Sequence, residues 1–150
     1  MPKKNITKKF NYPLKLVESL ILDIDSYKDF LPWCSESKII SKKKSDSCIE
    51  IVADLEIGYS FAKDVYTSHV IYDMKKNKII VNAIDGPLNI LENIWTLKNL
   101  GKNKCEVEFK IYIELKNAIL NKMLNAMFDL GFKKILKSFE DRAKFLSNSK

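Results

Sequence analysis

Apolar and charged residues alternate along two segments of this chain, and a long helical pattern follows the second of them. The clearer segment covers residues 105–115, where apolar residues occupy every second position and Glu or Lys fills most positions between them. Residues 48–57 show the same period of two. Such alternation predicts strands with one buried and one solvent-facing side, which antiparallel sheets permit. The chain is therefore restricted to folds in which one face of a sheet is covered.

The N-terminal part predicts a strand followed by two short helices. Residues 6–12 are typical of a strand, and Pro13 suits the first turn of an amphipathic helix over residues 13–23. Asp25 is expected to cap a second short helix, which Pro32 ends.

The middle of the chain predicts further strands joined by turns. We expect strands at residues 78–85 and 91–100, with turns at 75–77, 85–87 and 101–104. The order is therefore a strand, two small helices, an antiparallel sheet and a terminal helix, which is an α+β arrangement.

The terminal helix changes character along its length. Asn117 is expected to cap it, and it runs to about residue 146. Its first half is apolar around most of the circumference, whereas one stripe alone continues after Gly131, and an all-round apolar half needs a second apolar surface. That surface is either the first helix, a partner chain in an oligomer, or the wall of a cavity between sheet and helix. The apolar residues of the first half are Ile119, Leu120, Met123, Leu124, Met127, Phe128 and Leu130.

Length and composition indicate one domain. At 150 residues and 46% hydrophobic composition, we expect residues 1–150 to form a single unit with its own core. No Gly-, Pro- or Ser-rich linker divides the chain, and no apolar run approaches the ~18 residues of a membrane span. The first residues do not resemble a secretory signal.

The cysteines and the histidine do not form a metal-binding pattern. Cys34, Cys48 and Cys105 are odd in number and lack the CxxC spacing, which fits a reduced, cytoplasmic compartment. His69 is the one histidine, so a zinc ligand set is missing. We expect no metal site.

The basic composition favours nucleic-acid binding less than its net charge of +7 implies. Of the 26 basic residues, Arg142 alone is arginine, and lysine lacks the bidentate fork that favours phosphate and base recognition. The abundance of Lys, Ile and Asn also indicates AT-rich coding. A weak attraction to anionic membranes or RNA remains as a secondary expectation.

Residues 23–34 are the most informative segment for function. They combine Tyr27, Phe30, a Pro-Trp pair and Cys34 at the exit of a short helix. The segment offers neither a proton relay nor a metal-ligand set. We therefore interpret it as a wall of an apolar compartment and not as a catalytic centre.

This segment resembles the hallmark of the coenzyme Q-binding START-domain family. Further matches follow in family order over nearly the whole chain, at residues 53–59, 66–70, 86–88, 91–95 and 139–143. The resemblance implies the helix-grip (START-like) fold, in which a curved antiparallel sheet wraps around a long C-terminal helix. The family belongs to a superfamily of polyketide cyclases, dehydratases and lipid transport proteins.

The resemblance also implies a function. It implies a deep apolar cavity between sheet and final helix that binds ubiquinone (coenzyme Q) or a similar polyprenyl lipid, with no other cofactor. The protein would support respiratory electron transport as a quinone chaperone and visit the inner-membrane surface. The alternative is a ribosome-association toxin that binds the large ribosomal subunit, because the same family includes such bacterial proteins. The basic run at residues 42–44 favours this alternative.

The residues expected to line the cavity come from the inward side of the strands, the Pro-Trp pair and the last helix. They are Trp33, Leu55, Ile57, Tyr59, Trp95, Phe109, Ile111, Met123 and Met127. For the aliphatic members, ordinary core packing is the competing explanation. We expect no enzyme, because the inward side of the clear strands carries no general acid or base. The carboxylates of these strands fall on the solvent side, at Glu50, Asp54, Glu56, Glu106, Glu108 and Glu114.

Overall fold

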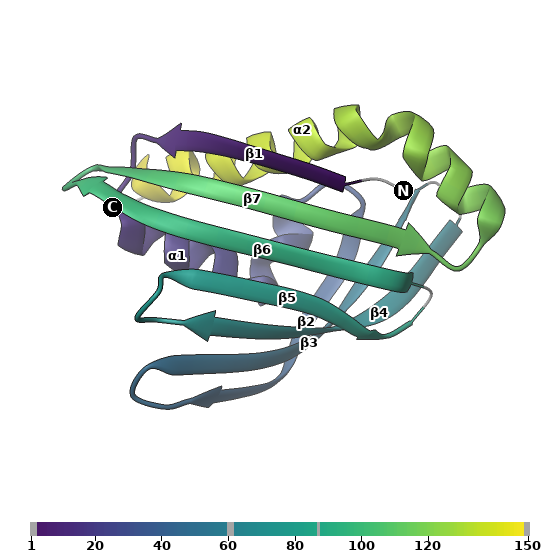
Figure 1. Ribbon diagram of the computed structural model, residues 1–150, viewed down its shortest axis with the longest axis horizontal. Helices are drawn as coiled ribbons and strands as arrows, with labels where there is room; N and C mark the ends of the chain where they lie inside the picture. Colours follow the sequence, from purple (N-terminus) through teal and green to yellow (C-terminus); the bar gives the residue numbers. More distant parts are fainter. Residues whose placement is uncertain (1–2, 60–61, 87, 149–150) are drawn as a thin grey trace.

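The computed structural model describes residues 3–59, 62–86 and 88–148. They form a curled antiparallel sheet with a long helix along its open side (Figure 1). In chain order the elements are β1 (Lys3–Phe10), α1 (Leu14–Leu22), η1 (Ile24–Asp29), β2 (Cys34–Lys44), β3 (Cys48–Tyr59), β4 (Ala62–Asp73), β5 (Lys78–Asp85), β6 (Leu88–Gly101), β7 (Lys104–Leu115) and α2 (Ala118–Asn148).

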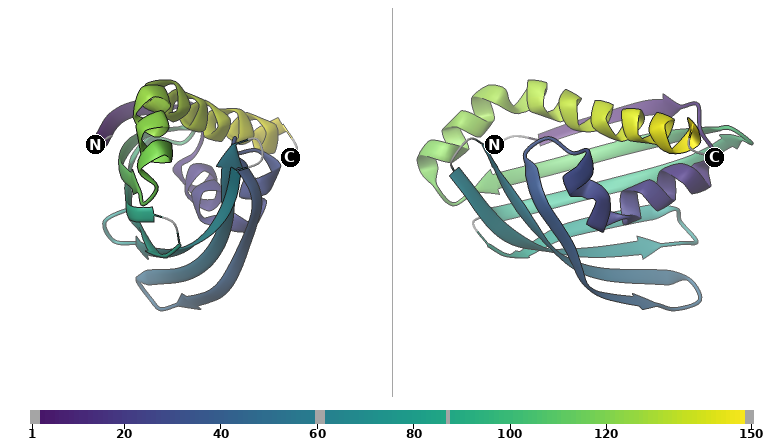
Figure 2. Two further views of the ribbon diagram at one scale, coloured as in Figure 1. Left: turned by 90° about the vertical axis from the view of Figure 1, so that its right-hand side faces the viewer. Right: turned by 180° about the vertical axis from the view of Figure 1, so that it is seen from behind.

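Strands β2 to β7 form a meander, and the first strand, β1, is added beside β7 at one edge of the sheet. The described part of the chain gives seven strands in the order β1-β7-β6-β5-β4-β3-β2, and all neighbours are antiparallel. The two edge strands, β1 and β2, therefore lie at opposite ends of the sheet order. Figure 2 shows that the sheet curls so far that α2 bridges the gap between its edges.

The two halves of α2 lie over different parts of the molecule. At 31 residues the helix is about 46 Å long. Figure 2 shows α1 inside the curl, beneath the C-terminal half of α2, whereas the N-terminal half extends over the other end of the sheet. We refer to that other end, where β3 and β7 end and β4 and β6 begin, as the wide end.

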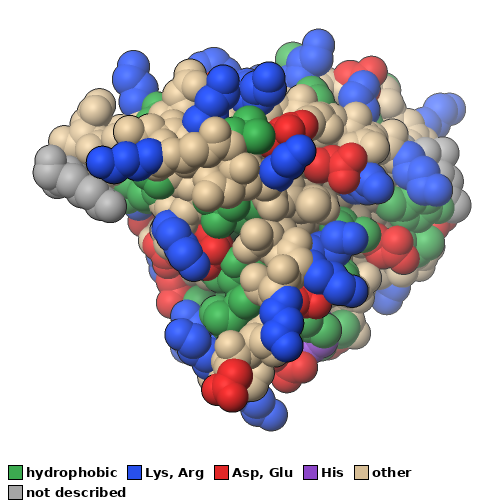
Figure 3. Space-filling model, turned by 60° about the vertical axis from the view of Figure 1, so that its left-hand side comes forward, with side chains coloured by type: hydrophobic (Ala, Val, Ile, Leu, Met, Phe, Trp, Pro, Cys, Tyr) green, Lys and Arg blue, Asp and Glu red, His purple; other side chains and the backbone are tan. Residues whose placement is uncertain are grey.

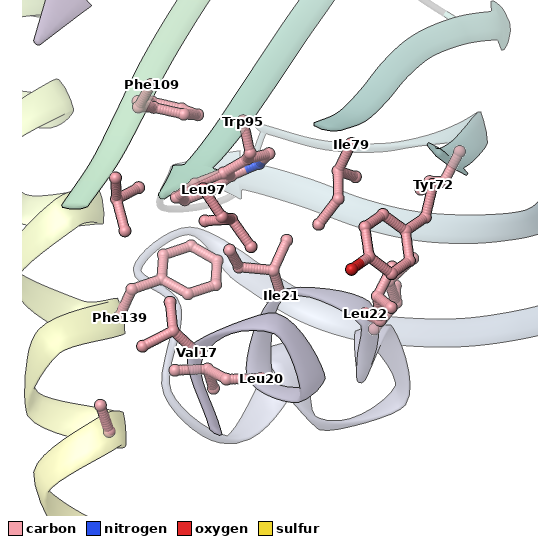
Figure 4. Close-up of a cluster of buried hydrophobic side chains, with 14 of the residues drawn as sticks. Val17, Leu20, Ile21, Leu22, Tyr72, Ile79, Trp95, Leu97, Phe109 and Phe139 are labelled. Atoms are coloured by element: carbon pink, nitrogen blue, oxygen red, sulfur yellow. The ribbon is translucent and has the colours of Figure 1, made fainter. Parts of the chain in front are cut away.

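The core at the α1 end is well filled. Val17, Leu20 and Ile21 of α1 are each at most 2% exposed, and Ile21 points towards Leu97 on the inner face of the sheet (Figure 4). They meet Leu97 on β6 and Phe139 on α2 (Figure 4). Because α1 supplies three large aliphatic side chains here, this end of the interior is packed with buried apolar residues.

Most expected elements are confirmed. The strand at residues 78–85 is β5 exactly as expected, and the strongest alternating segment is β7. The expected cap of the last helix is also present, because Asn117 Oδ1 accepts a hydrogen bond from the backbone N–H of Ile119 at 3.0 Å.

The role expected for Asp25 is wrong. Asp25 lies inside η1, which is a 3-10 helix, and its position is not the N-cap. Its carboxylate instead accepts a hydrogen bond from the backbone N–H of Ile39 on β2, at 2.6 Å. The side chain therefore holds η1 against an edge strand, a long-range contact that local sequence does not reveal.

Gly86 is required where the turn after β5 passes β4. Its φ is +121°, and a Cβ at this position would lie 2.7 Å from both Cα and Cβ of Tyr66. The register of β4 against β5 shifts between Thr67 and Ser68, at the same place. Glycine therefore meets two requirements at once, an unusual backbone conformation and a close approach to another strand.

We expect Gly86→Ala to lower the free energy of unfolding by about 3 kcal/mol, because backbone strain and a steric clash add together. Gly101→Ala is a matched control: Gly101 also has a positive φ, +146°, but nothing lies within 4 Å of a Cβ there. Its expected cost is about 1 kcal/mol. Denaturant unfolding of both variants measures the difference, and equal losses would contradict the close approach to Tyr66.

Candidate functional site

The inner face of β7 changes from fully to partly buried along its length. Val107 and Phe109 are each 1% exposed, whereas the next two inward residues, Ile111 and Ile113, are only half-buried. The change occurs on one face of one strand, so it reflects what covers the strand. The C-terminal half of β7 is covered less completely than the N-terminal half.

The inner face of β3 shows the same change at the same end. Ile51 is fully buried and Leu55 is 5% exposed, but Ile57 is half-buried. On β4, the inward-facing Tyr66 is likewise half-buried, whereas Val70 is 3% exposed. Three strands therefore present incompletely covered apolar side chains at the wide end of the sheet. We call this region the inner chamber, and we define it by Ile57, Tyr66, Ile111 and Ile113.

An aromatic cluster fills the interior next to the chamber. The rings of Trp95 and Phe109 lie 4.3 Å apart between centroids, and Trp95 contacts Phe139 of α2 edge-on at 5.0 Å. Phe109 also stacks on Phe132 of α2 at 5.1 Å. These contacts fix the second half of α2 on the sheet and form the inner limit of the chamber.

Helix α2 is held on both edges of the sheet. On the β1 side, Lys4 Nζ lies 2.8 Å from Asp129 Oδ1, and Lys8 Nζ lies 3.2 Å from Glu140 Oε1. The hydrogen bond from Lys4 lowers the pKa of the Asp129 carboxyl group. These are exposed or partly exposed pairs, so each adds little stability by itself.

On the opposite edge the helix is held by Trp33. This residue has a φ of +63°, and its carbonyl oxygen accepts a hydrogen bond from the N–H of Gly58 at 3.0 Å. Its indole ring lies so close to Gly131 that a Cβ there would be 3.1 Å from Trp33 Cη2. Lys134 Nζ lies 6.0 Å from the centre of the same ring. Trp33 therefore closes the gap between η1, β2 and the middle of α2.

The thiol and phenol groups near this closure stay neutral around pH 7. Burial, and after it the nearby Glu36, raises the pKa of the Cys34 thiol to about 11. Burial also raises the pKa values of Tyr27 and Tyr66 above the usual phenol range. The Tyr27 hydroxyl donates a hydrogen bond to the carbonyl oxygen of Ile21. A general acid or base works best with a pKa near the operating pH, and these shifts move away from it.

Glu50, Asp54 and Glu56 lie on the outer face of the sheet, as expected, whereas Asp64 on β4 pairs with the inward-facing Ile57 and is exposed at the wide end. On the outer face, Glu50 pairs with His69, whose Nε2 lies 3.3 Å from Glu50 Oε2. Asp54 Oδ1 accepts a hydrogen bond from the Thr67 hydroxyl at 2.7 Å. Glu56 accepts one from Ser35 at 2.6 Å. These groups point away from the interior and do not contact a molecule held in the chamber.

The nine predicted lining residues fall into three groups. Ile57 and Ile111 lie in the chamber wall, and Trp33 lies at the closing contact with α2. Leu55, Trp95 and Phe109 are buried on the inner face, where the last two form part of the aromatic cluster. The side chains of Tyr59, Met123 and Met127 lie outside the described residues, as do those of Leu120 and Leu124.

Asn93 is a residue that the sequence analysis missed. It faces inward on β6, and its Oδ1 is buried without a hydrogen-bond partner among the described residues. The signal was present in the sequence, because Leu91, Asn93, Trp95 and Leu97 share one parity on the strand. Asn93 is the polar member of an otherwise apolar inward set.

Two surface grooves lie outside the chamber. One, of about 340 Å³, runs over the outer face between β1, β7 and β6 and includes Lys3, Glu92 and Tyr112. The other, of about 540 Å³, lies between α1 and β2 and includes Asp23 and Lys42. The first groove is lined mainly by apolar surface and includes Ile94 and Ile111 beside its charged residues. The second is lined mainly by polar surface, which suits polar molecules.

Two further findings concern metals and membranes. Among the described residues, no three His, Cys, Asp or Glu side chains gather in a way that would coordinate a metal ion. The helices of the described chain are either too short or too polar to span a bilayer.

Comparisons with known proteins agree with this architecture. The chain is 32% identical over 149 residues to the mitochondrial coenzyme Q-binding protein of Dictyostelium discoideum, covering 97% of this chain and 71% of that protein. It is also 32% identical over 141 residues to the ribosome association toxin of Rickettsia prowazekii, covering 92% and 93%.

Solved structures confirm the expected helix-grip fold. The solution structure of an 18 kDa protein from Caulobacter crescentus matches with a TM-score of 0.78 at 28% identity, covering 99% of both chains. A START superfamily protein from Mycobacterium smegmatis matches with a TM-score of 0.79 at 16% identity, covering 96% and 98%. The Zhui aromatase/cyclase of a Streptomyces species matches with a TM-score of 0.77 at 15% identity, covering 95% and 93%, and shows the fold alone.

A family model completes the assignment. The model described as polyketide cyclase / dehydrase and lipid transport matches residues 10–140, which is most of the chain. Together with the two relatives above 30% identity, this match shows that the chain belongs to the polyketide cyclase / dehydrase and lipid transport family.

Proposed function

We propose that this protein binds ubiquinone or a similar polyprenyl lipid in the inner chamber, without catalysis, and supports respiratory electron transport as a quinone chaperone. The observation that carries the proposal is the change from full to partial burial on the inner faces of β3 and β7, at the same end of the sheet. Apolar side chains that a helix covers incompletely offer contact surface to an apolar guest.

The chemistry of the chamber suits a neutral, oily ligand. Burying one five-carbon isoprene unit is worth up to about 4 kcal/mol, at about 0.8 kcal/mol per carbon, before the cost of ordering the chain. Two or three units therefore give useful affinity from Ile57, Ile111 and their neighbours alone. The neutral state of Tyr66 and Cys34 near pH 7 also avoids a buried charge beside the ligand.

Exposed apolar residues at the wide end support contact with a membrane surface. Val65 on β4, Ile84 on β5 and Ile119 at the start of α2 are 45%, 58% and 74% exposed. They lie at the end where the chamber wall is least covered. A protein that loads a lipid from a bilayer needs its entrance close to the bilayer, and the position of these residues supports that role.

The absence of catalysis is part of the proposal. The relative from Dictyostelium discoideum is named for binding coenzyme Q and not for a reaction. The likeness to the Streptomyces cyclase shows a shared fold, and folds of this kind carry several functions. Burial raises the pKa values of Tyr27, Tyr66 and Cys34, which leaves these groups unsuited to acid–base work at neutral pH.

A second candidate function is association with the large ribosomal subunit. It is favoured by the relative from Rickettsia prowazekii, which the alignment covers almost completely. Lys42, Lys43 and Lys44 are exposed together on the edge strand β2. On the face in Figure 3, however, Lys and Arg side chains are spread among Asp and Glu and do not form one basic patch.

The quinone proposal is tested by titrating the purified protein with a ubiquinone analogue that carries a ten-carbon tail. We expect saturable binding that Ile111→Phe weakens at least tenfold, because the larger side chain fills the chamber. Ile94→Phe is the matched control, since Ile94 is half-buried on the outer face of the neighbouring strand. Absence of binding by the unmodified protein, in titration and in lipid extraction, would refute the proposal.

The ribosomal candidate is tested by sedimentation of cell extracts through a sucrose gradient during overexpression. If this function holds, the protein co-sediments with the large subunit and subunit joining falls. Replacement of residues 42–44 by Glu is then expected to release the protein, because phosphate contacts depend on positive charge. A protein that stays at the top of the gradient, with normal subunit joining, removes this candidate.

The contact between Trp33 and Gly131 is tested by a double-mutant cycle. Gly131→Ala improves helix propensity by about 1 kcal/mol, but its Cβ meets the indole ring. In a Trp33→Phe background, whose shorter ring does not reach the helix, we expect Gly131→Ala to stabilise by about that amount. With Trp33 present the gain is smaller by at least about 0.5 kcal/mol. The same effect in both backgrounds would show that Trp33 does not close against α2.

A further inference from the structure

Asn93 places a carboxamide in an apolar part of the inner sheet face. Its partners across the sheet are Val81 on β5 and Ile111 on β7. The next inward residues on its own strand are Leu91 and Trp95, both less than 10% exposed. The Oδ1 atom is nevertheless buried without a hydrogen-bond donor among the described residues.

An unpaired buried acceptor destabilises the empty protein, and a leucine at this position would remove that cost. A trapped water is a poor substitute, because a buried water requires two to four polar partners and the neighbours of Asn93 on the sheet are apolar. The arrangement is explained if the donor arrives with a guest molecule. A hydroxyl or amine of the guest would pair Asn93 Oδ1.

The position of Asn93 gives the orientation of that guest. One register step towards α1, Trp95 and Phe109 belong to the packed aromatic cluster. One step in the other direction, Ile113 is half-buried in the chamber wall. Asn93 therefore lies at the inner limit of the chamber, so the end of the guest that reaches it is the end inserted first.

The chemistry of Asn93 Oδ1 determines which chemical groups can form a hydrogen bond with it. A carboxamide oxygen accepts a hydrogen bond, so its partner carries an O–H or N–H. A quinone ring has carbonyl and ether oxygens, which accept, whereas the reduced hydroquinone ring has two hydroxyl groups, which donate. The amide N–H groups of Asn93 can serve the oxidised ring, but Oδ1 then remains unpaired.

We propose that Asn93 accepts a hydrogen bond from a ring hydroxyl of the guest, so that the protein binds the reduced, hydroquinone form head-first and in preference to the oxidised form. This inference rests on the proposed function, since it concerns the same chamber. It adds a binding residue, an orientation and a redox preference.

The test compares three probes with the same ten-carbon tail: the oxidised ubiquinone analogue, its hydroquinone under anaerobic reducing conditions, and decylbenzene, which lacks ring oxygens. We expect the unmodified protein to bind the hydroquinone about tenfold more tightly than the quinone. Asn93→Leu and the smaller Asn93→Ala lose this preference and keep their affinity for decylbenzene. Asn82→Leu, on the outer face of β5 opposite Glu92, behaves like the unmodified protein.

Orientation has its own readout in a Trp33→Phe background, where Trp95 is the remaining tryptophan. Trp95 is two residues from Asn93 on the same face, about 6.6 Å along the strand. A ring bound at Asn93 quenches Trp95 fluorescence, and decylbenzene does not.

The outcomes separate the two proposals. If the unmodified protein binds none of the probes, the proposed function fails and the role of Asn93 fails with it. If it binds both redox forms equally, or if the Asn93 variants weaken all three probes alike, the function stands and the role of Asn93 is refuted. A higher melting temperature for Asn93→Leu together with the lost preference supports the inference, because it shows that the unpaired oxygen serves binding at a cost to stability.

Discussion

The aromatic contact between the second half of α2 and the inner sheet is the interaction on which the rest of the structure depends. Phe132 and Phe139 pack on Phe109 and Trp95, and α1 fills the remaining space beneath them. Because α2 continues through Gly131 as one helix, fixing its second half determines where its first half lies. The first half lies over the wide end, where α1 does not reach, and Ile57, Ile111 and Ile113 are only partly covered there.

The chamber combines two features that favour a lipid over a reactive substrate. Its described wall is mostly apolar, and burial keeps the Cys34 thiol and the Tyr66 phenol neutral near pH 7. Charged side chains lie instead on the outer face, where Glu50 and Asp54 meet polar partners. Asn93 adds a carboxamide to this wall, and a few well-placed polar groups in a mostly apolar site orient a ligand without reacting with it.

Much of the fold can be predicted from local sequence patterns. The strict alternation of β7, the turn residues around β5 and the Asn117 cap identified these elements because each depends on neighbours in the sequence. Strand β2 was missed for a physical reason. Its register against β3 shifts twice, between Cys34 and Glu36 and between Ile39 and Ser41, so its buried residues do not keep a period of two.

The site was predictable only in part. Ile57 and Ile111 were identified from strand parity, but parity does not tell a packed position from a half-covered one, and so Trp95 and Phe109 were placed in the same set. That distinction depends on where α1 ends beneath α2, which is a tertiary property. The positive φ of Trp33 and its approach to Gly131 likewise depend on contacts between distant segments.

The central claim, an accessible apolar space beneath the first half of α2, is tested most directly by isoleucine-methyl NMR of the empty protein under xenon pressure, since xenon enters apolar cavities. The account predicts xenon-dependent shifts for Ile57, Ile111 and Ile113, and none for Ile49, Ile51 and Ile79, which pack at the filled end. Unchanged methyl signals at Ile57, Ile111 and Ile113 would contradict it.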